Sequence, residues 1–109
     1  MKRIILILTL LCAFVNLNAQ KIYKHAEKAI KYYETENYSK ASHEFELDYI
    51  ATGELSSLYN AGFTAWLCKE YQRASQLFTK CIDEYYYYDG EVYSKLADCY
   101  ANLGNKDLA

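Results

Sequence analysis

Apolar and polar positions along the chain follow a pattern that returns after 33 residues. The stretch NYSKASHEF at residues 37–45 is matched by EYQRASQLF at residues 70–78. The shared side chains are Tyr38, Ala41 and Phe45 in the first copy and Tyr71, Ala74 and Phe78 in the second. Such a period is typical of helix-turn-helix repeats, which stack because one unit cannot bury its apolar face alone. The pattern therefore predicts an all-α repeat solenoid of antiparallel helix pairs.

Turn signals divide the chain into five helices, with a sixth beginning near Lys106. Gly53 and the pair Asp89 and Gly90 would separate one helix pair from the next, because glycine readily adopts the left-handed conformation that ends many helices. The chain has no proline, so no residue of this kind breaks the predicted helices. We expect helices at residues 22–35, 38–51, 55–68, 71–87 and 90–103.

The N-terminal segment has the layout of a secretory signal peptide. Lys2 and Arg3 precede an apolar run at residues 4–15 and a short polar stretch that contains Ala19. This run is shorter than the roughly 20 residues that a helix needs to cross a membrane. We therefore predict a signal peptide at residues 1–19, cleaved after Ala19. The mature chain would cross the inner membrane and be periplasmic or outer-membrane associated, with no stable membrane span.

Two details of this segment leave alternatives open. Cleavage after Ala19 resembles Gram-negative bacterial signals, but Leu17 lies where a small residue is preferred, so the position of the cut is open. Cys12 raises the alternative of a lipoprotein, although bulky Leu11 precedes it where a small residue is expected. Lipidation is therefore the less favoured interpretation.

Residues 22–109 resemble the tetratricopeptide repeat family, whose units place small side chains where two helices cross and large apolar ones beside them. The small crossing positions are Ala29, Ala41, Gly62, Ala74, Cys81, Ala97 and Ala109. The aromatic positions are Tyr32, Tyr38, Phe45, Tyr71, Phe78, Tyr93 and Tyr100. The resemblance implies one domain at residues 20–109, with units at about 22–54, 55–89 and 90–109. Because the last unit is incomplete, we expect further downstream repeats in a longer protein, or a truncated reading frame.

One helical stripe indicates which end of the predicted array is free. In a stacked array this stripe of each first helix faces the preceding unit. The first helix has lysines there, which fits a solvated cap, and the later helices have small or apolar residues. A basic patch for anionic lipid is the alternative interpretation of the lysines. The stripe consists of Lys24, Lys28 and Lys31, then Ser57, Ala61 and Thr64, then Val92, Leu96 and Cys99.

Charge argues against nucleic-acid binding. The whole chain has 12 Lys and Arg against 14 Asp and Glu. Loss of residues 1–19, which contain Lys2 and Arg3 and no acidic residue, leaves 10 against 14. Binding to nucleic acid needs a clustered basic surface that displaces counterions from phosphates. A mildly acidic mature chain is therefore expected to have no nucleic-acid partner.

Candidate chemistry is sparse. Three cysteines remain after signal cleavage, namely Cys68, Cys81 and Cys99. Cys81 and Cys99 could form a disulfide. Alternatively, both are free thiols that act as small apolar residues. His25 and His43 have no Cys or His at metal-ligand spacing. We expect no metal, no cofactor and no catalytic residues, so the chain is predicted not to be an enzyme.

The resemblance implies a groove lined by the first helix of each unit. Some family members clamp a peptide carboxylate there, and Asn60 and Lys95 match two clamp positions. Ala26, Ile30 and Glu91 lie where that clamp needs basic or amide groups, so we do not expect a clamp. The lining is instead aromatic with acidic edges. The predicted partner-binding residues are Tyr23, Tyr33, Tyr59, Asn60, Phe63, Trp66 and Lys95.

Two functions follow as hypotheses. The first is a non-catalytic scaffold of the bacterial envelope that binds an apolar or basic protein segment in the groove, where Trp and Tyr anchors usually dominate affinity. The alternative is a carbohydrate or cell-wall binding module that uses aromatic residues such as Tyr59, Trp66 and residues 85–88. Packing between helices is the simpler interpretation of Phe63 and Trp66. The simpler interpretation of residues 85–88 is a helix end whose alternate rings pack on the next unit.

Overall fold

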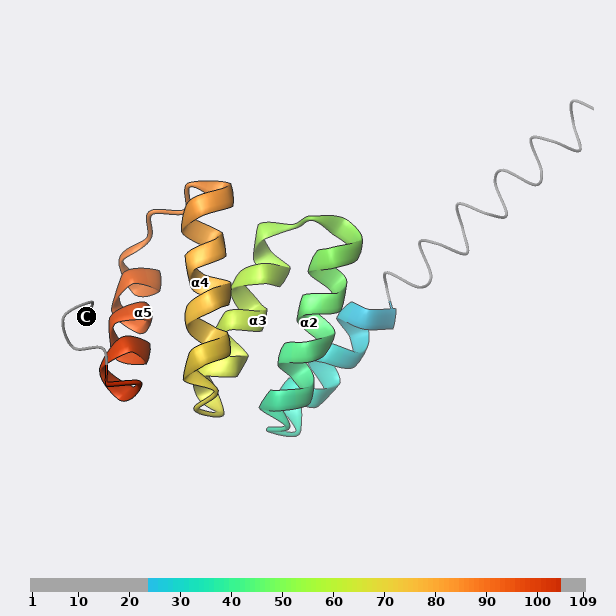
Figure 1. Cartoon of the computed structure of the whole chain (residues 1–109). Helices are drawn as coiled ribbons and strands as arrows, with labels where there is room; N and C mark the ends of the chain where they lie inside the picture. The colour runs from blue at the N-terminus through green and yellow to red at the C-terminus, as the bar shows by residue number, and fades with distance from the viewer. Residues whose placement is uncertain (1–23, 105–109) are drawn as a thin grey trace, which may run out of the picture.

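The computed structural model describes residues 24–104 (Figure 1). These residues form helices and turns, without a strand among them. The predicted all-α class is therefore confirmed, and the bounds of the four complete helices differ from the predicted ones by no more than two residues. The predicted signal peptide and the sixth helix lie outside the described residues. The helices are an N-terminal helix at residues 24–34, α2 (Tyr38–Thr52), α3 (Leu55–Leu67), α4 (Tyr71–Tyr85) and α5 (Gly90–Asn102).

Helices that follow one another in the chain pack side by side (Figure 1). Side chains also join alternate helices. Tyr59 of α3 contacts Glu91 of α5, and Arg73 of α4 contacts Glu46 of α2. Tyr33 of the N-terminal helix lines a pocket together with residues of α3. The helices therefore form two layers, with the N-terminal helix, α3 and α5 in one and α2 and α4 in the other.

The main apolar core lies between α3, α4 and α5. Gly62 of α3 lets α4 approach closely, because a Cβ atom there would lie 3.0 Å from Cε1 of Phe78. Gly62, Ala74 and Cys81 are all buried, as expected for small residues where helices cross. Burying a Leu or Phe side chain contributes about 1.5–3 kcal/mol each. The core residues are Leu58, Ala61, Ala65, Ala74, Leu77, Phe78, Cys81, Val92 and Cys99.

Helix ends follow the turn signals at Gly53 and depart from them after α4. Gly53 has the predicted left-handed conformation, with φ 70°. The prediction of a helix at residues 71–87 was too long, because Tyr86 takes the left-handed conformation (φ 54°) and ends α4 at Tyr85. The predicted start of the next helix at Gly90 is confirmed, although Gly90 does not take the left-handed conformation expected of it. The N-cap of α5, Asp89, accepts a hydrogen bond from the backbone N–H of Glu91.

The run of tyrosines at residues 85–88 alternates between packing and exposure. Tyr85 donates a hydrogen bond from its hydroxyl to the carbonyl of Gly53 (2.5 Å). The ring of Tyr87 meets the ring of Tyr59 edge-on, with centroids 6.1 Å apart. Tyr86 and Tyr88 are 72% and 68% exposed. The rings alternate between packing and exposure as predicted, but Tyr85 and Tyr87 pack on residues earlier in the chain and not on the next unit.

The stripe that we assigned to contacts between units is buried where it was expected to be. Ser57, Ala61 and Thr64 of α3 are buried, as are Val92 and Cys99 of α5, whereas Leu96 is partly buried. The equivalent residues of the N-terminal helix, Lys24, Lys28 and Lys31, are exposed. This difference is what the cap interpretation predicts, since nothing among the described residues covers that face.

Candidate functional site

Three aromatic side chains form a row along α3. Tyr59, Phe63 and Trp66 are spaced by four and three residues, which places them on one face of the helix. The ring of Phe63 is stacked with both neighbours, at 6.2 Å from Tyr59 and 6.1 Å from Trp66 between centroids. All three are half-buried. One side of this row faces α5, and the other side faces the N-terminal helix.

On one side, α5 covers the row. Lys95 places Nζ 5.4 Å from the centre of the Phe63 ring and 5.2 Å from that of Trp66, which is cation–π geometry. The indole N–H of Trp66 donates to Oδ2 of Asp98 (2.8 Å). The Lys95 side chain is only 14% exposed. These contacts support the interpretation of Trp66 as a packing residue between helices.

Tyr59 also contacts α5. Its hydroxyl donates to Oε2 of Glu91 (3.1 Å), which also lies 3.8 Å from Nζ of Lys95. Burial and the Glu91 carboxylate raise the pKa of Tyr59 to about 12. The phenol therefore stays protonated and keeps donating throughout the neutral range.

On the other side, a small apolar pocket opens between the N-terminal helix and α3. Its volume is about 210 Å³, and we call it the N-terminal pocket. The polar side chains in its lining are those of Tyr33, Asn60 and Thr64, and the Thr64 hydroxyl donates to the backbone carbonyl of Asn60 (2.7 Å). The lining residues are Tyr33, Phe45, Asn60, Phe63 and Thr64.

Exposed apolar side chains continue from this pocket along the N-terminal helix. Ile30 is 51% and Tyr33 43% exposed, and a spacing of three residues puts them on one face. A second hollow of about 280 Å³ is lined by Ile30 with Ala26, Glu27, Lys31 and Glu34. The surface is therefore apolar with acidic neighbours.

The predicted site residues are thus separated into two groups. Tyr33, Asn60 and Phe63 line the N-terminal pocket, where Phe45 of α2 joins them. Tyr59, Trp66 and Lys95 lie on the far side of Phe63, in contact with α5. Tyr23 lies outside the described residues. A role of these residues in binding a partner stays a prediction.

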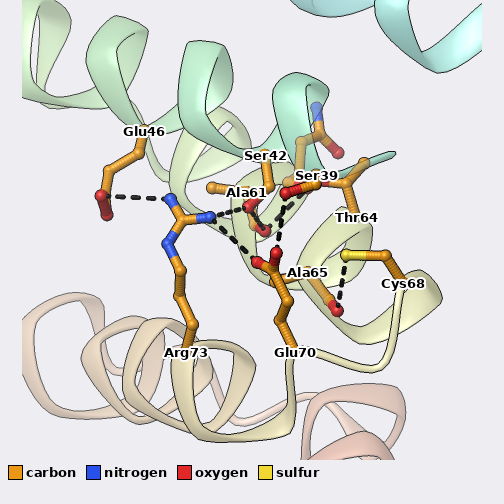
Figure 2. A network of polar contacts seen from close by, with 10 residues as sticks. Ser39, Ser42, Glu46, Ala61, Thr64, Ala65, Cys68, Glu70 and Arg73 are labelled. Carbon is orange, nitrogen blue, oxygen red and sulfur yellow. Dashed lines mark hydrogen bonds and ion pairs between the residues drawn. The ribbon is translucent and has the colours of Figure 1, made fainter. Parts of the chain in front are cut away.

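A second concave surface, of about 820 Å³, lies along α2 and α4 in the other layer. Its lining includes Glu46, Glu70 and Arg73. These residues belong to the polar cluster of Figure 2, in which Arg73 reaches from α4 towards α2. Arg73 donates to Oγ of Ser42 (2.6 Å) and to Oε1 of Glu46 (3.2 Å), and lies 3.7 Å from Oε2 of Glu70. Ser39 donates to the other oxygen of Glu70 (2.7 Å). Arg73 thus lies between two carboxylates and joins α4 to α2, while Oε2 of Glu70 is buried without a hydrogen-bond partner among the described residues.

Arg73 was missed by the sequence reasoning. It is the only arginine after residue 3, and it lies in the repeated stretch at the position where the first copy has Lys40. The change from lysine to arginine could have indicated a contact with carboxylates, because arginine offers several N–H donors in a fixed plane and can bind two carboxylates at once. Lys40 instead lies over the ring of Tyr32, at 5.8 Å from its centre.

The remaining titratable groups serve packing. His25 and Oε2 of Glu44 are 2.7 Å apart and join the N-terminal helix to α2. Cys81 and Cys99 are buried free thiols, and burial raises the pKa of each to about 11. Within residues 24–104, no three His, Cys, Asp or Glu side chains are grouped so as to hold a metal ion. In the same part of the chain, no helix has the length and apolarity to cross a membrane.

Comparisons with models of protein families, with curated proteins and with solved structures gave no match for this chain. Its fold and candidate site therefore have to be interpreted from its own residues.

Proposed function

We propose that the chain is a non-catalytic protein-binding scaffold of the bacterial envelope, built as a tetratricopeptide-like repeat solenoid. The observation that carries the proposal is the N-terminal pocket together with the exposed side chains of Ile30 and Tyr33 beside it. Exposed apolar side chains around a hollow are typical of surfaces that bind another protein. The binding residues are Tyr33, Asn60 and Phe63, with Tyr23 as the predicted continuation of the same helix face.

Contacts that recur at one sequence interval support the repeat architecture. A solenoid brings equivalent positions of successive units together, so side-chain contacts recur at separations close to the repeat length. Five hydrogen bonds between different helices or turns join residues that are 31 or 32 positions apart. The pairs are Ser39 and Glu70, Ser42 and Arg73, Tyr59 and Glu91, Trp66 and Asp98, and Tyr85 and Gly53.

The size of the pocket favours a protein segment over a small molecule. Sites that enclose a drug-sized ligand have volumes of about 300–1,000 Å³. The N-terminal pocket has about 210 Å³, and its lining is mostly apolar. Such a pocket suits one side chain of an extended or helical segment that runs along the surface. The signal peptide at residues 1–19, with the envelope location it implies, belongs to the same proposal.

Carbohydrate or cell-wall binding is the alternative, and one observation favours it. The exposed rings of Tyr86 and Tyr88 have centroids 6.5 Å apart and form an aromatic surface at the α4–α5 connection. Trp66 no longer supports this alternative, because Lys95 lies over its ring and Asp98 accepts its N–H. Peptidoglycan fragments that produced saturable NMR shifts at Tyr86 and Tyr88 would favour the alternative.

Site-specific photo-crosslinking tests the proposal. The full chain is exported in a Gram-negative host with p-benzoylphenylalanine at position 33, and the envelope fraction is irradiated. We expect a discrete crosslinked polypeptide, because Tyr33 is half exposed at the mouth of the pocket.

The matched control carries the same group at position 88, which is an exposed tyrosine far from the pocket in sequence. Equal crosslinking from both positions, or none from position 33, would contradict the proposal.

A further inference from the structure

We propose that the hollow between α4 and α5 is a docking groove for the chain's own segment after Gly104, and that Leu108 of this segment covers the ring of Tyr100. The hollow has a volume of about 560 Å³ and is lined by residues of α4 together with Tyr100 of α5. Residues 105–109 lie outside the described part of the chain, whereas the surface that would receive them lies within it. The inference rests on the repeat architecture of the proposed function.

The N-terminal helix, α3 and α5 end in the same backbone turn. A residue with positive φ follows each helix, namely Glu36 (60°), Lys69 (64°) and Gly104 (83°). Its N–H donates to the carbonyl three residues earlier, at 3.1, 3.1 and 3.2 Å respectively. After the first two turns the chain reverses, and α2 and α4 begin two residues later. The same turn at Gly104 therefore directs the chain back along α5, with Lys106 at the position where a helix would begin.

Counting from the turn residue gives the register of the segment. The fifth residue after the turn residue is Ala41 before α3 and Ala74 before α5, and both are fully buried. The fifth residue after Gly104 is Ala109. Small side chains are needed where two helices approach closely. Ala109 therefore has the side chain that packing against α5 requires.

The preceding position indicates what Leu108 contacts. Lys40 is the fourth residue after the first turn residue, and its Nζ lies 5.8 Å from the centre of the ring of Tyr32, the fourth residue before it. The second turn has an alanine at the latter position, so it offers no ring there. At the third turn the pair is Leu108 and Tyr100. A leucine over this ring buries apolar surface, which stabilises the contact.

The face of α5 that would receive the segment is partly uncovered among residues 24–104. Where α4 packs on α3, Leu58 and Ala65 are fully buried. At the same distances from the turn, α5 has Tyr93, which is 46% exposed, and Tyr100, which is half-buried and lines the hollow. The hollow therefore lies where the next helix would continue the arrangement of α3 and α4.

NMR spectroscopy of the exported chain, with residues 105–109 intact, tests this inference. We expect nuclear Overhauser contacts between the Leu108 methyl groups and the Tyr100 ring. The ring should also move the Leu108 methyl resonances upfield from their random-coil positions. Cα chemical shifts at residues 106–109 should be typical of a helix, and none of these signals should depend on protein concentration.

A pair of variants assigns the effect to the groove. Tyr100→Leu should abolish the upfield shift of the Leu108 methyl groups while it keeps an apolar side chain on α5. The matched control Tyr88→Leu removes an exposed ring from the α4–α5 connection and should leave the shift unchanged. Random-coil shifts at Leu108 and Ala109, or equal effects of the two variants, overturn the inference. A shift that appears only at high protein concentration would make a second copy the occupant and overturn it as well.

This inference and the proposed function fail in different ways. Crosslinking of a protein at position 33 together with random-coil shifts at residues 106–109 would leave the scaffold function standing and remove the docked segment. A contact between Leu108 and Tyr100 without crosslinking at position 33 would keep the docked segment and remove the partner-binding role of the N-terminal pocket.

Discussion

Two buried thiols sit at the boundary between α4 and α5. Cys81 and Cys99 are fully buried in the core, where a small apolar side chain is needed for close helix packing. The sequence left a disulfide between them open, and in the structure both are free thiols. Because burial disfavours the thiolate, the pKa of each is raised to about 11 from a usual value of 9.0.

This shift predicts a loss of stability in alkaline solution. The unfolded chain releases these thiol protons near pH 9, whereas the folded chain holds them to about pH 11. The free energy of unfolding should therefore fall as the pH rises from 9 to 11, and be insensitive to these thiols below pH 9. Urea denaturation at a series of pH values measures it.

The double variant Cys81→Ala and Cys99→Ala is the control, because it keeps small apolar side chains without a titrating group. Tyr49 and Tyr59, whose pKa values are also raised, titrate in both proteins. The native chain should lose more stability than the variant between pH 9 and 11. Parallel curves would contradict the assignment to the thiols.

At the scale of elements, the end of α4 stores backbone strain. Tyr86 has a φ of 54°, a region where a side chain with a Cβ costs about 1–2 kcal/mol relative to glycine. The conformation is maintained by hydrogen bonds from the N–H of Tyr86 to Ile82 and from that of Tyr87 to Cys81. The tyrosine ring itself is mostly exposed, so little packing compensates for the strain.

Tyr86→Gly should therefore raise the free energy of unfolding by about 1 kcal/mol, measured by urea denaturation. Tyr88→Gly is the matched control, because Tyr88 is similarly exposed and is not among the described residues with positive φ. No gain from the first variant, or an equal gain from the second, would show that the left-handed residue is not strained.

The helices could be predicted from the sequence, but the C-terminal end of α4 could not. A repeated apolar pattern and the position of Gly53 sufficed to place the helices. The start of α5 at Gly90 was predicted, but the end of α4 was placed two residues too late, because tyrosine disfavours the left-handed conformation that Tyr86 adopts. Tertiary contacts of Tyr85 and Tyr87 determine where the helix stops, and these are not visible in a local pattern.

For the whole molecule, the distribution of the core predicts which helices open first. α3 and α4 contribute seven of the nine residues of the core cluster, and α5 contributes Val92 and Cys99. Amide hydrogen exchange should therefore be slowest in α3 and α4, with faster exchange in α5 and in the N-terminal helix. Exchange in α5 as slow as in α4 would contradict this order.

The candidate site was predictable only in part at this scale. The helical face that bears Tyr33, Asn60, Phe63 and Trp66 could be assigned from repeat positions alone. The sequence did not show that Trp66 contacts α5 while Phe63 lines the N-terminal pocket. This separation depends on Lys95 and Asp98, which reach Trp66 from a helix about 30 residues later in the chain. The Arg73 joint was missed for the same reason, since its partners come from the preceding repeat position on α2.

The contacts of Trp66 give the molecule an optical reporter for one joint. Trp66 is the only tryptophan in the chain, and its indole nitrogen and ring face both meet α5 through Asp98 and Lys95. An indole emits at longer wavelength in water than in a partly enclosed site. The wavelength of its emission maximum therefore reports whether α5 is packed on α3. A change at the N-terminal helix should leave this wavelength unaltered unless it also changes the contact between α3 and α5.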